Sequence, residues 1–580
     1  MPSASTSASA NPWGHRARAF LALWLVLGLA ACASYSHTNR PLAPAEPAEP
    51  TKTRATFSIG GERGNPRVLM FLALSGGGSR AAYFSAATML QLQTIFPDVD
   101  LLNEVDVMSS VSGGSMTAAL YAATRDVEIS SPPLVAALPA TVQGTPLASR
   151  IKVDAQTLRC SAPLQPDELI WLNEQLPALS AELRRLDTLC RQAPLTHLRD
   201  WDRPSVLSLT SRNYLMRWFG NWFWPTNIAR YWFTAYDRGD IMAQTLADNL
   251  YGTRFLGVDL SLGDLNPTRP YLLINATTAT DQDAPGINAA DEYAFGSVFT
   301  FTEQDFRDRL NSDIGRYSLA RAVMASSAFP LVFPSQTLQD YRPSALQTYC
   351  QDDRNGELKC TDKQYLHVFD GGNSDNLGLK SIKRALFQME AEGRLTHDRI
   401  IVLLVDAFTR PRGASRLNPD PRGTVGLLLD ANLSDAVDSL LQNNRSKLMG
   451  EFDSARLRWT DGDCRPETRE LPSALCKALS THEPQHLNLT KRLVFYHVGF
   501  DDVVAMDPKN AGLKRQLDMI PTSFKLAPLD AGLIDKAVQA IITPENPCLQ
   551  QIRALVLAEE STADAVLAAR KICSDTDPRQ

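Results

Sequence analysis

Apolar runs that alternate with helix-like segments dominate the pattern of this chain. Residues 67–74 (RVLMFLAL) and 104–111 (EVDVMSSV) are typical of strands buried on both faces of a parallel sheet. Each run is followed by a glycine-containing turn and then by a segment with helical spacing, at residues 81–96 and 116–125. Further candidate strands lie at residues 270–278, 366–372, 399–407 and 492–500. This alternation predicts an α/β fold, layered around a central, mostly parallel sheet.

Two longer regions lack the strand pattern. Residues from about 127 to 265 predict a mostly helical insertion, and residues from about 525 to 580 predict a helical tail. The insertion holds the segment from Tyr214 to Tyr236, which contains four of the nine tryptophans. Tryptophan and tyrosine favour membrane interfaces because one end of each side chain is apolar and the other is wet. A buried aromatic core fits the same pattern, so both interpretations stay open.

The N-terminus has the pattern of an export signal. Residues 20–31 (FLALWLVLGLAA) form an uncharged run after basic residues, shorter than the roughly 20 apolar residues that cross a bilayer. The run ends in LAAC, residues 29–32, which resembles the lipobox of bacterial lipoproteins, whose cysteine becomes the lipid-modified first residue. We therefore expect a signal peptide at residues 1–31 and lipidation of Cys32. An ordinary signal peptide cut near Ala31, or an uncut membrane anchor, is the alternative.

The expected mature N-terminus, residues 32–66, is rich in proline, alanine and charge, which is typical of an extended tether. Ala33 follows the expected lipidated cysteine, and this resembles lipoproteins sent to the outer membrane of Gram-negative bacteria. We therefore expect an outer-membrane lipoprotein of the bacterial cell envelope that faces the periplasm and is anchored through Cys32.

Composition and charge narrow the class of protein. With 44% hydrophobic and 21% charged residues in 580, the chain is globular rather than disordered or fibrous. The net charge of −6 is spread over acids and bases alike, so no basic face for nucleic acid is expected.

Eight cysteines remain once Cys32 is set aside, an even number that agrees with export into an oxidising compartment. They form four sequence-local couples: Cys160 and Cys190, Cys350 and Cys360, Cys464 and Cys476, and Cys548 and Cys573. We predict disulfides between these nearest neighbours, although eight cysteines allow 105 connectivities. Metal binding is the weaker alternative because no CxxC spacing occurs, and no metal site is expected.

Ser112 lies where a predicted strand gives way to a predicted helix, in SSVSGGS at residues 109–115. A nucleophile elbow needs small residues two places before and two places after the serine, because the turn is tight. Here Gly113 and Gly114 follow, and Ser110 stands where a glycine is usual. The dipole of the helix would favour an alkoxide at its N-terminus. A serine that fills the turn or caps the helix is the alternative.

The loop GGGSR, residues 76–80, joins the first predicted strand to the first predicted helix. Glycines before a helix N-terminus direct several N–H groups to one point, and such a nest binds an anion. A phosphate-binding loop would need G-x-x-x-x-G-K-[ST], and a dinucleotide fingerprint would need glycine where Ala81 stands. An oxyanion hole needs only converging N–H groups, and a purely structural turn is the alternative. The candidate oxyanion-loop residues are Gly76, Gly77, Gly78, Ser79 and Arg80.

Asp370 ends the apolar segment YLHVF and precedes Gly371 and Gly372. Its carboxylate would project from a strand end, where α/β folds assemble their sites. From there it could accept the proton of a serine directly, provided that it lies within hydrogen-bond reach. An ordinary turn aspartate is the alternative.

In this order, the glycine loop, the elbow and FDGG resemble the patatin-like phospholipase family. Residues 317–335 (YSLARAVMASSAFPLVFPS) and 520–526 (IPTSFKL) add to the likeness, which spans about residues 67–545. The resemblance implies a layered α/β/α patatin-like fold with a helical insertion. It also implies a catalytic dyad of Ser112 and Asp370, a glycine-rich oxyanion loop, and no metal or organic cofactor.

By the same resemblance, the substrate would be a membrane phospholipid or lysophospholipid ester. Residues 546–580, beyond the family likeness, are predicted as a C-terminal helical tail. Arg80 would either fix the glycine loop or meet a substrate phosphate. The departures from the family pattern are Ser110 and Ala81. A lipid-binding or lipid-trafficking lipoprotein with a weak hydrolase site is the alternative function. A Ser–His–Asp triad is the alternative mechanism, although His367 would point to the opposite face of its strand from the aspartate.

Overall fold

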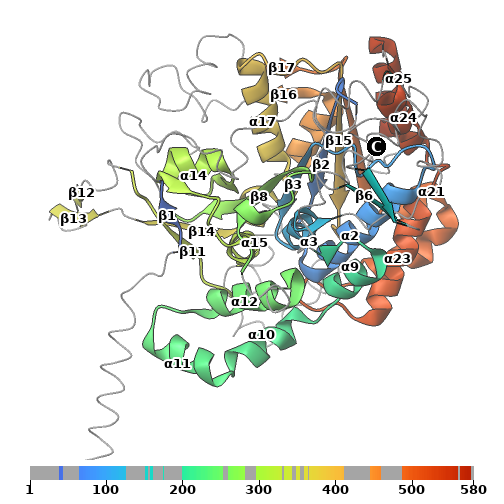
Figure 1. Cartoon of the computed structure of the whole chain (residues 1–580). Helices are drawn as coiled ribbons and strands as arrows, with labels where there is room; N and C mark the ends of the chain where they lie inside the picture. Colours follow the sequence, from blue (N-terminus) through green and yellow to red (C-terminus); the bar gives the residue numbers. More distant parts are fainter. Residues whose placement is uncertain are drawn as a thin grey trace, which may run out of the picture.

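A sheet of eight strands runs through the computed structural model, and helices cover both of its faces (Figure 1). The structure describes residues 38–42, 65–125, 151–154, 157–160, 174, 199–252, 259–280, 295–329, 332–342, 348–352, 358–362, 365–409, 445–458, 486–559 and 562–575.

The strands of the sheet are β2 Val68–Leu74, β3 Val107–Val111, β8 Tyr271–Thr278, β9 Val298–Phe301, β11 Gln336–Gln339, β14 Tyr365–Asp370, β15 Arg399–Asp406 and β18 Leu493–Gly499. Their order is β11-β14-β8-β3-β2-β15-β18, and β9 also pairs with β8. From β8 to β18 every neighbouring pair is parallel. By contrast, β14 is antiparallel to both of its neighbours, and β9 is antiparallel to β8. The expected mostly parallel sheet is therefore confirmed, with antiparallel strands at one side.

Both faces of the sheet are buried, as the continuous apolar runs predict. In β2, Met70 and Leu72 belong to one hydrophobic core, whereas Leu69 and Phe71 belong to a second. Successive side chains of a strand point to opposite faces, so the two cores lie on opposite sides of the sheet. This arrangement confirms the predicted α/β/α layering.

Helices α2 (Gly78–Thr94) and α3 (Gly113–Ala122) follow β2 and β3 and pack against each other on the first core. Helix α17 (Leu379–Ala391) contributes to the second core on the other face. The remaining α-helices are α9 Arg203–Thr210, α10 Tyr214–Trp222, α11 Pro225–Phe233, α12 Arg238–Leu246, α14 Glu303–Leu310, α15 Leu319–Ser326, α16 Gly372–Asp375, α21 Asp502–Met506, α22 Ala511–Leu517, α23 Pro528–Ile541, α24 Pro547–Leu557 and α25 Ala563–Asp575.

Short elements complete the described chain. The two-stranded pairs are β1 Arg40–Pro41 with β10 Ser312–Asp313, β4 Thr124–Arg125 with β7 Arg199–Asp200, β5 Ile151–Asp154 with β6 Thr157–Cys160, β12 Thr348–Asp352 with β13 Leu358–Asp362, and β16 Arg456–Arg458 with β17 His486–Asn488. The π-helix and 3-10 turns are η4 Ala247–Tyr251, η5 Leu262–Asp264 and η8 Pro508–Asn510.

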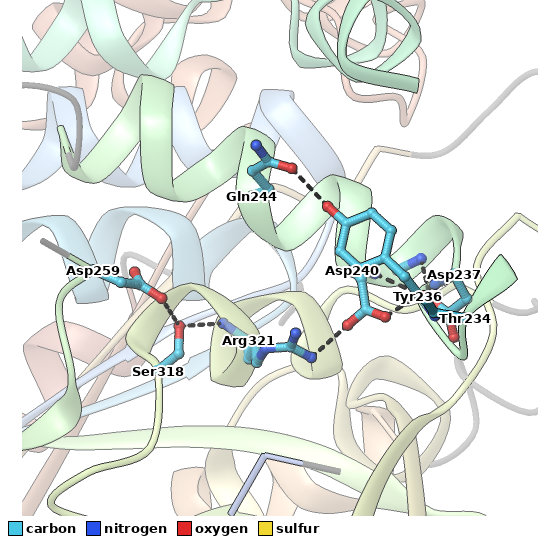
Figure 2. Close-up of polar contacts among 9 residues, drawn as sticks. Thr234, Tyr236, Asp237, Asp240, Gln244, Asp259, Ser318 and Arg321 are labelled. Atoms are coloured by element: carbon cyan, nitrogen blue, oxygen red, sulfur yellow. Dashed lines mark hydrogen bonds and ion pairs between the residues drawn. The ribbon is translucent and has the colours of Figure 1, made fainter. Parts of the chain in front are cut away.

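The described part of the predicted insertion is mostly helical, with α9 to α12 in residues 199–252, and it also holds the short strands β5, β6 and β7. Figure 2 shows how it is fastened to α15: Arg321 forms an ion pair with Asp240 of α12. Ser318, the N-cap of α15, donates a hydrogen bond to Asp259 at 2.9 Å. The first contact is largely buried and the second is exposed, and together they hold the insertion against the helix that follows β9 and α14 in the chain.

The helical tail contains α23, α24 and α25, and the disulfide between Cys548 and Cys573 joins the last two. This pairing confirms one of the four predicted disulfides. In the β12–β13 hairpin the backbones of Cys350 and Cys360 lie directly opposite each other. The predictions for Cys32, Cys160, Cys190, Cys350, Cys360, Cys464 and Cys476 rest on side chains outside the described residues.

Part of the predicted tether packs on the folded body. The side-chain amide of Asn39 donates hydrogen bonds to Ser312 and to the carbonyl of Gln339, and the next two residues form β1. The predicted signal peptide, residues 1–31, lies outside the described residues. Within the described part of the chain, no helix combines the length and the apolar character that crossing a bilayer requires.

Candidate active site

Ser112 occupies a sharp turn between β3 and α3. Its backbone has φ 49° and ψ −118°, a conformation that residues other than glycine rarely adopt. The N–H groups of Ser115 and Met116 donate to its carbonyl oxygen, so the helix begins directly after the serine. A strained residue at a strand-to-helix junction is the geometry of a nucleophile elbow, which exposes the hydroxyl at the tip of the turn.

The two glycines after Ser112 let neighbouring backbones approach it. A Cβ atom on Gly113 would lie 2.0 Å from the carbonyl oxygen of Gly78, and one on Gly114 would lie 2.5 Å from that of Leu74. Any side chain at these two positions would therefore push the glycine loop or β2 away from the turn.

The other serines of this stretch are buried and hydrogen-bonded. The hydroxyl of Ser110 donates to the carbonyl of Leu273 at 3.1 Å, and that of Ser109 donates to the carbonyl of Gly378 at 2.6 Å. The hydroxyl of Ser115 donates to that of Ser110 at 3.1 Å. These three hydroxyls are engaged in hydrogen bonds that hold the strand and the turn in place, which is a structural role and not that of a nucleophile.

Asp370 lies beside the Ser112 turn at the end of a strand that runs in the opposite direction to β3. Val111, the last residue of β3, pairs with Asn275 of β8, whereas Asp370, the last residue of β14, pairs with Ala276. Because β14 is antiparallel, its carboxyl end does not share an edge with those of the parallel strands. The two ends meet because β8 continues beyond β3 and β14 pairs with that extension. This approach differs from the simple strand-end argument made from the sequence.

The hydroxyl of Ser112 donates to Oδ2 of Asp370 at 3.3 Å. The other carboxylate oxygen, Oδ1, accepts the N–H of Gly372 at 2.8 Å. Burial raises the pKa of Asp370 to about 6, and the hydrogen bonds from Gly372 and Ser112 oppose that rise. Gly371 permits close packing, since a Cβ there would lie 2.3 Å from the carbonyl oxygen of Asn275. The structure thus brings together the serine, the aspartate and both glycines named from the sequence.

Fewer N–H groups of the glycine loop are free than the sequence predicts. Those of Gly76 and Ser79 donate to carbonyl oxygens of distant segments at 3.0 and 2.7 Å. For the N–H groups of Gly77, Gly78 and Gly113, the described residues supply no hydrogen-bond acceptor. The candidate oxyanion donors therefore narrow to these three, and Gly113 had been considered only as part of the elbow.

The loop lies directly against the serine. A Cβ on Gly76 would lie 3.4 Å from the Cβ of Ser112, and a Cβ on Gly113 would lie 2.9 Å from the nitrogen of Gly78. Gly77 and Gly78 have φ values of 143° and 61°, which favour glycine and turn the chain sharply into α2. The glycine loop, with its unpaired N–H groups, consequently borders Ser112.

Arg80 is buried under this loop. Its Nη1 donates to the carbonyl of Ile520 at 2.5 Å, and burial lowers its pKa to about 10. The residue Ser523, a little further along the same segment, accepts the N–H of Ser79. The sequence left two roles open for Arg80, fixing the glycine loop or meeting a substrate phosphate. Its contacts in the structure are those expected of a residue that fixes the loop.

Ser326, the last residue of α15, was not singled out from the sequence. Its hydroxyl oxygen accepts the N–H of Ser112 at 2.9 Å and donates to the carbonyl of Asn275 at 2.6 Å. Its own carbonyl accepts the N–H of Gly371 at 3.1 Å. One residue therefore positions both the serine turn and the turn after the aspartate. The available signal was its place within residues 317–335, which carried part of the family likeness.

The hydrogen bonds of the two strand histidines lead away from Ser112. Nδ1 of His367 lies 3.0 Å from the hydroxyl of Thr337, and Nε2 of His497 lies 3.1 Å from Oδ2 of Asp406. Burial alone would raise the pKa of Asp406, but ionic contact with Arg445 and the His497 bond hold it well below its usual range. Within the described residues, no group of three or more acidic, histidine or cysteine side chains is placed to hold a metal ion.

Comparison with known proteins finds one family and several similar solved structures. The family model described as patatin-like phospholipase matches residues 72–382, more than half of the chain. The human GIVD cytosolic phospholipase A2 is a similar solved structure, with 11% identity, TM-score 0.34 and coverage of 88% of this chain. This chain spans 63% of that protein.

Two bacterial structures are also similar. VipD from Legionella pneumophila has 12% identity and TM-score 0.25, with coverage of 88% of this chain and 70% of VipD. The ExoU–SpcU complex from Pseudomonas aeruginosa has 15% identity and TM-score 0.19, with coverage of 93% and 83%. Comparison with curated protein sequences gives no match. On the family match, this chain belongs to the patatin-like phospholipase family.

Proposed function

We propose that this protein is a lipid acyl hydrolase of phospholipase A or lysophospholipase type, which cleaves carboxylic esters of membrane lipids. Membership of the family supports lipid hydrolysis in general. The observation that carries the specific proposal is the 3.3 Å hydrogen bond from the strained Ser112 to the buried Asp370, beside unpaired backbone N–H groups.

The reaction begins with attack of Ser112 Oγ on the ester carbonyl carbon, while Oδ2 of Asp370 takes the hydroxyl proton. The carbonyl oxygen becomes an oxyanion, and the N–H groups of Gly77, Gly78 and Gly113 stabilise it at about 3–4 kcal/mol per donor. The intermediate then expels the alcohol, which receives the proton from Asp370. This leaves an acyl ester on Ser112.

Water completes the cycle. The water oxygen attacks the carbonyl carbon of the acyl ester while Asp370 takes a proton from the water. A second oxyanion then forms at the same N–H groups. Collapse releases the fatty acid and returns the proton to Ser112. Because Asp370 must be ionised to act as a base, its pKa of about 6 keeps it competent at neutral pH and close to the optimum for proton transfer.

A fluorophosphonate probe tests this proposal. The intact protein should form a covalent adduct on Ser112, located by mass spectrometry of its peptides, and Ser112→Ala should form none. Ser110→Ala is the matched control, because it removes a neighbouring hydroxyl that is bonded elsewhere, and it should still be labelled. Absence of labelling in folded wild-type protein would contradict the hydrolase and favour the lipid-binding alternative. Lipid products of wild type and Ser112→Ala would then identify the ester that is cleaved.

We also propose that the protein is exported and lipidated at Cys32, as an outer-membrane lipoprotein facing the periplasm. The apolar run and LAAC support this, as does the disulfide of Cys548 and Cys573, which suits an oxidising compartment. Metabolic labelling with an alkyne fatty acid should mark the wild type and not Cys32→Ser. Equal labelling of both would contradict lipidation at this residue.

A further inference from the structure

Helices α10 and α11 direct an apolar surface outward. Met216, Phe219 and Phe223, spaced three and four residues apart, are 63%, 40% and 70% exposed. Trp224 is 64% exposed, and Ile228, four residues later, is also exposed. This spacing places each set along one side of its helix. We call the aromatic face the surface formed by Met216, Phe219, Phe223, Trp224, Ile228 and Trp232.

The inner side of α10 accounts for the buried part of the same segment. Tyr214 and Trp218 are buried, and Trp218 packs against Trp222 with ring centroids 5.0 Å apart. The buried-core interpretation of this tryptophan-rich segment is therefore confirmed for the inner side of α10, and the membrane-interface interpretation stays a prediction for the exposed side. Exposed apolar patches of this kind mark surfaces that bind a protein or a membrane.

Charge favours an anionic partner. Between Asp202 and Asp237 the chain has no acidic residue and four arginines. Arg217 and Arg230 are exposed beside the aromatic face. The guanidinium of Arg217 donates to a side-chain amide oxygen, and that of Arg230 lies over an aromatic ring at 4.0 Å. These contacts are with an amide and an aromatic ring, and neither contact neutralises the positive charge of the arginine.

The aromatic face lies on the outer side of a helix whose inner side adjoins the active site. The N–H of Tyr214 donates to the carbonyl of Phe524 at 3.0 Å. The ring of Phe333 contacts both Phe524 and Trp218, at centroid distances of 5.5 and 5.3 Å. Ser523, next to Phe524, holds the glycine loop through its carbonyl.

A second exposed apolar group lies closer to the dyad. The carbonyl of Ala328 accepts the N–H of Asp370 at 3.1 Å, and the next residue, Phe329, is 51% exposed. Val332 is also exposed, and it is followed directly by the Phe333 that contacts α10. Exposed apolar side chains thus extend from the aromatic face toward the aspartate.

We propose that the aromatic face docks on a lipid bilayer that carries anionic headgroups. Exposed Trp and Phe side chains would enter the interface, and Arg217 and Arg230 would meet headgroup phosphates. The inference rests on the proposed function and deepens it, because docking through α10 would place the site beside the bilayer that holds its substrate. The expected lipid anchor would act together with this surface: Asn39 is held on the body only seven residues after Cys32, a reach of about 25 Å at full extension.

Vesicles of equal parts phosphatidylglycerol and phosphatidylcholine, brominated in the acyl chains, provide the test. Bromine quenches the fluorescence of tryptophans that enter the membrane. The full-length wild type should be quenched, and Trp224→Phe should lose the part of the quenching that Trp224 contributes. Phe223→Ala/Trp224→Ala should bind at least about tenfold more weakly. Arg217→Gln should weaken binding about fivefold, and only when phosphatidylglycerol is present.

Leu567→Ala is the matched control, since Leu567 is an exposed leucine on α25, at the opposite end of the molecule from α11 in Figure 1. It should bind like the wild type. Hydrolysis of a soluble short-chain ester should be equal in all variants, while vesicle hydrolysis should fall with binding in Phe223→Ala/Trp224→Ala. All variants share the N-terminal segment, so differences between them report on α10 and α11.

The outcomes separate this inference from the proposed function. Equal quenching of wild type and Trp224→Phe would overturn the docking proposal even if the ester is hydrolysed. Loss of quenching in Trp224→Phe, with no hydrolysis of any ester, would support docking and overturn the hydrolase. The wild type could instead form a dimer that the double substitution Phe223→Ala/Trp224→Ala dissociates, without any quenching by lipid. That result would assign the aromatic face to a second copy of the chain and would overturn the bilayer-docking proposal.

Discussion

Replacing Asp370 with asparagine should abolish hydrolysis and, at the same time, stabilise the fold at neutral pH. The carboxyl is buried, and its pKa is raised from 3.8 to about 6. The difference is about 2 pKa units, and each unit corresponds to about 1.36 kcal/mol. The ionised carboxylate therefore lowers the free energy of unfolding by about 3 kcal/mol, which the neutral amide would recover.

The size of this stabilisation depends on pH in a defined window. Below about pH 4 the carboxyl of Asp370 is protonated in both the folded and the unfolded protein, so the substitution should change stability little. Between about pH 4 and pH 6 the unfolded chain ionises first, and the wild type loses stability as the pH rises. Above about pH 6 the full difference of about 3 kcal/mol should separate the two proteins. The rate of hydrolysis by the wild type should rise with pH around pH 6, because Asp370 must be ionised to act as a base.

Urea denaturation followed by circular dichroism, from about pH 4 to pH 8, measures the free energy of unfolding for both proteins. Glu545→Gln, at an exposed carboxylate, is the matched control and should change stability by less than about 0.5 kcal/mol. An Asp370→Asn protein no more stable than wild type at pH 8, or a gain that is constant across the range, would refute the argument that burial of this carboxylate sets its pKa.

Three further results are expected. His367→Ala and His497→Ala should keep most ester hydrolysis per folded molecule, because their hydrogen bonds lead away from the serine; a folded variant without activity would indicate a triad. Ser326→Ala should lower kcat about ten- to a hundredfold with little change in KM, and should reduce the free energy of unfolding by about 1–3 kcal/mol, whereas Ser326→Thr should restore part of kcat. Replacing both Cys548 and Cys573 with alanine should lower the free energy of unfolding by about 3 kcal/mol, given their sequence separation of 25, and unchanged urea denaturation would contradict this.

The sequence predicted the strands and their layering well, for a simple physical reason. A strand buried on both faces must be apolar at nearly every position, so the runs at residues 67–74 and 399–407 correspond closely to β2 and β15. The turn after β2 could be predicted equally well from its glycines, because Gly77 and Gly78 adopt backbone angles that other residues avoid. Local patterns of this kind depend only on neighbours in the chain.

The antiparallel approach of β14 could not be predicted in the same way. Its apolar pattern is the same for either direction, and only pairing with the extension of β8 brings Asp370 to Ser112. The tryptophan-rich segment was similarly ambiguous, because the side of α10 that is buried depends on Phe333 and Phe524.

By itself the sequence determined the order of the elements, the residue types of the elbow, loop and aspartate motifs, and through them the family. Tertiary structure alone decided which N–H groups remain unpaired, that Ser326 joins the serine turn to the aspartate turn, and that the aromatic face points outward. Hydrogen bonding and burial of this kind join residues more than 200 positions apart. Such pairings leave no periodic trace in a single chain, and they exist only once the sheet and its helices have packed.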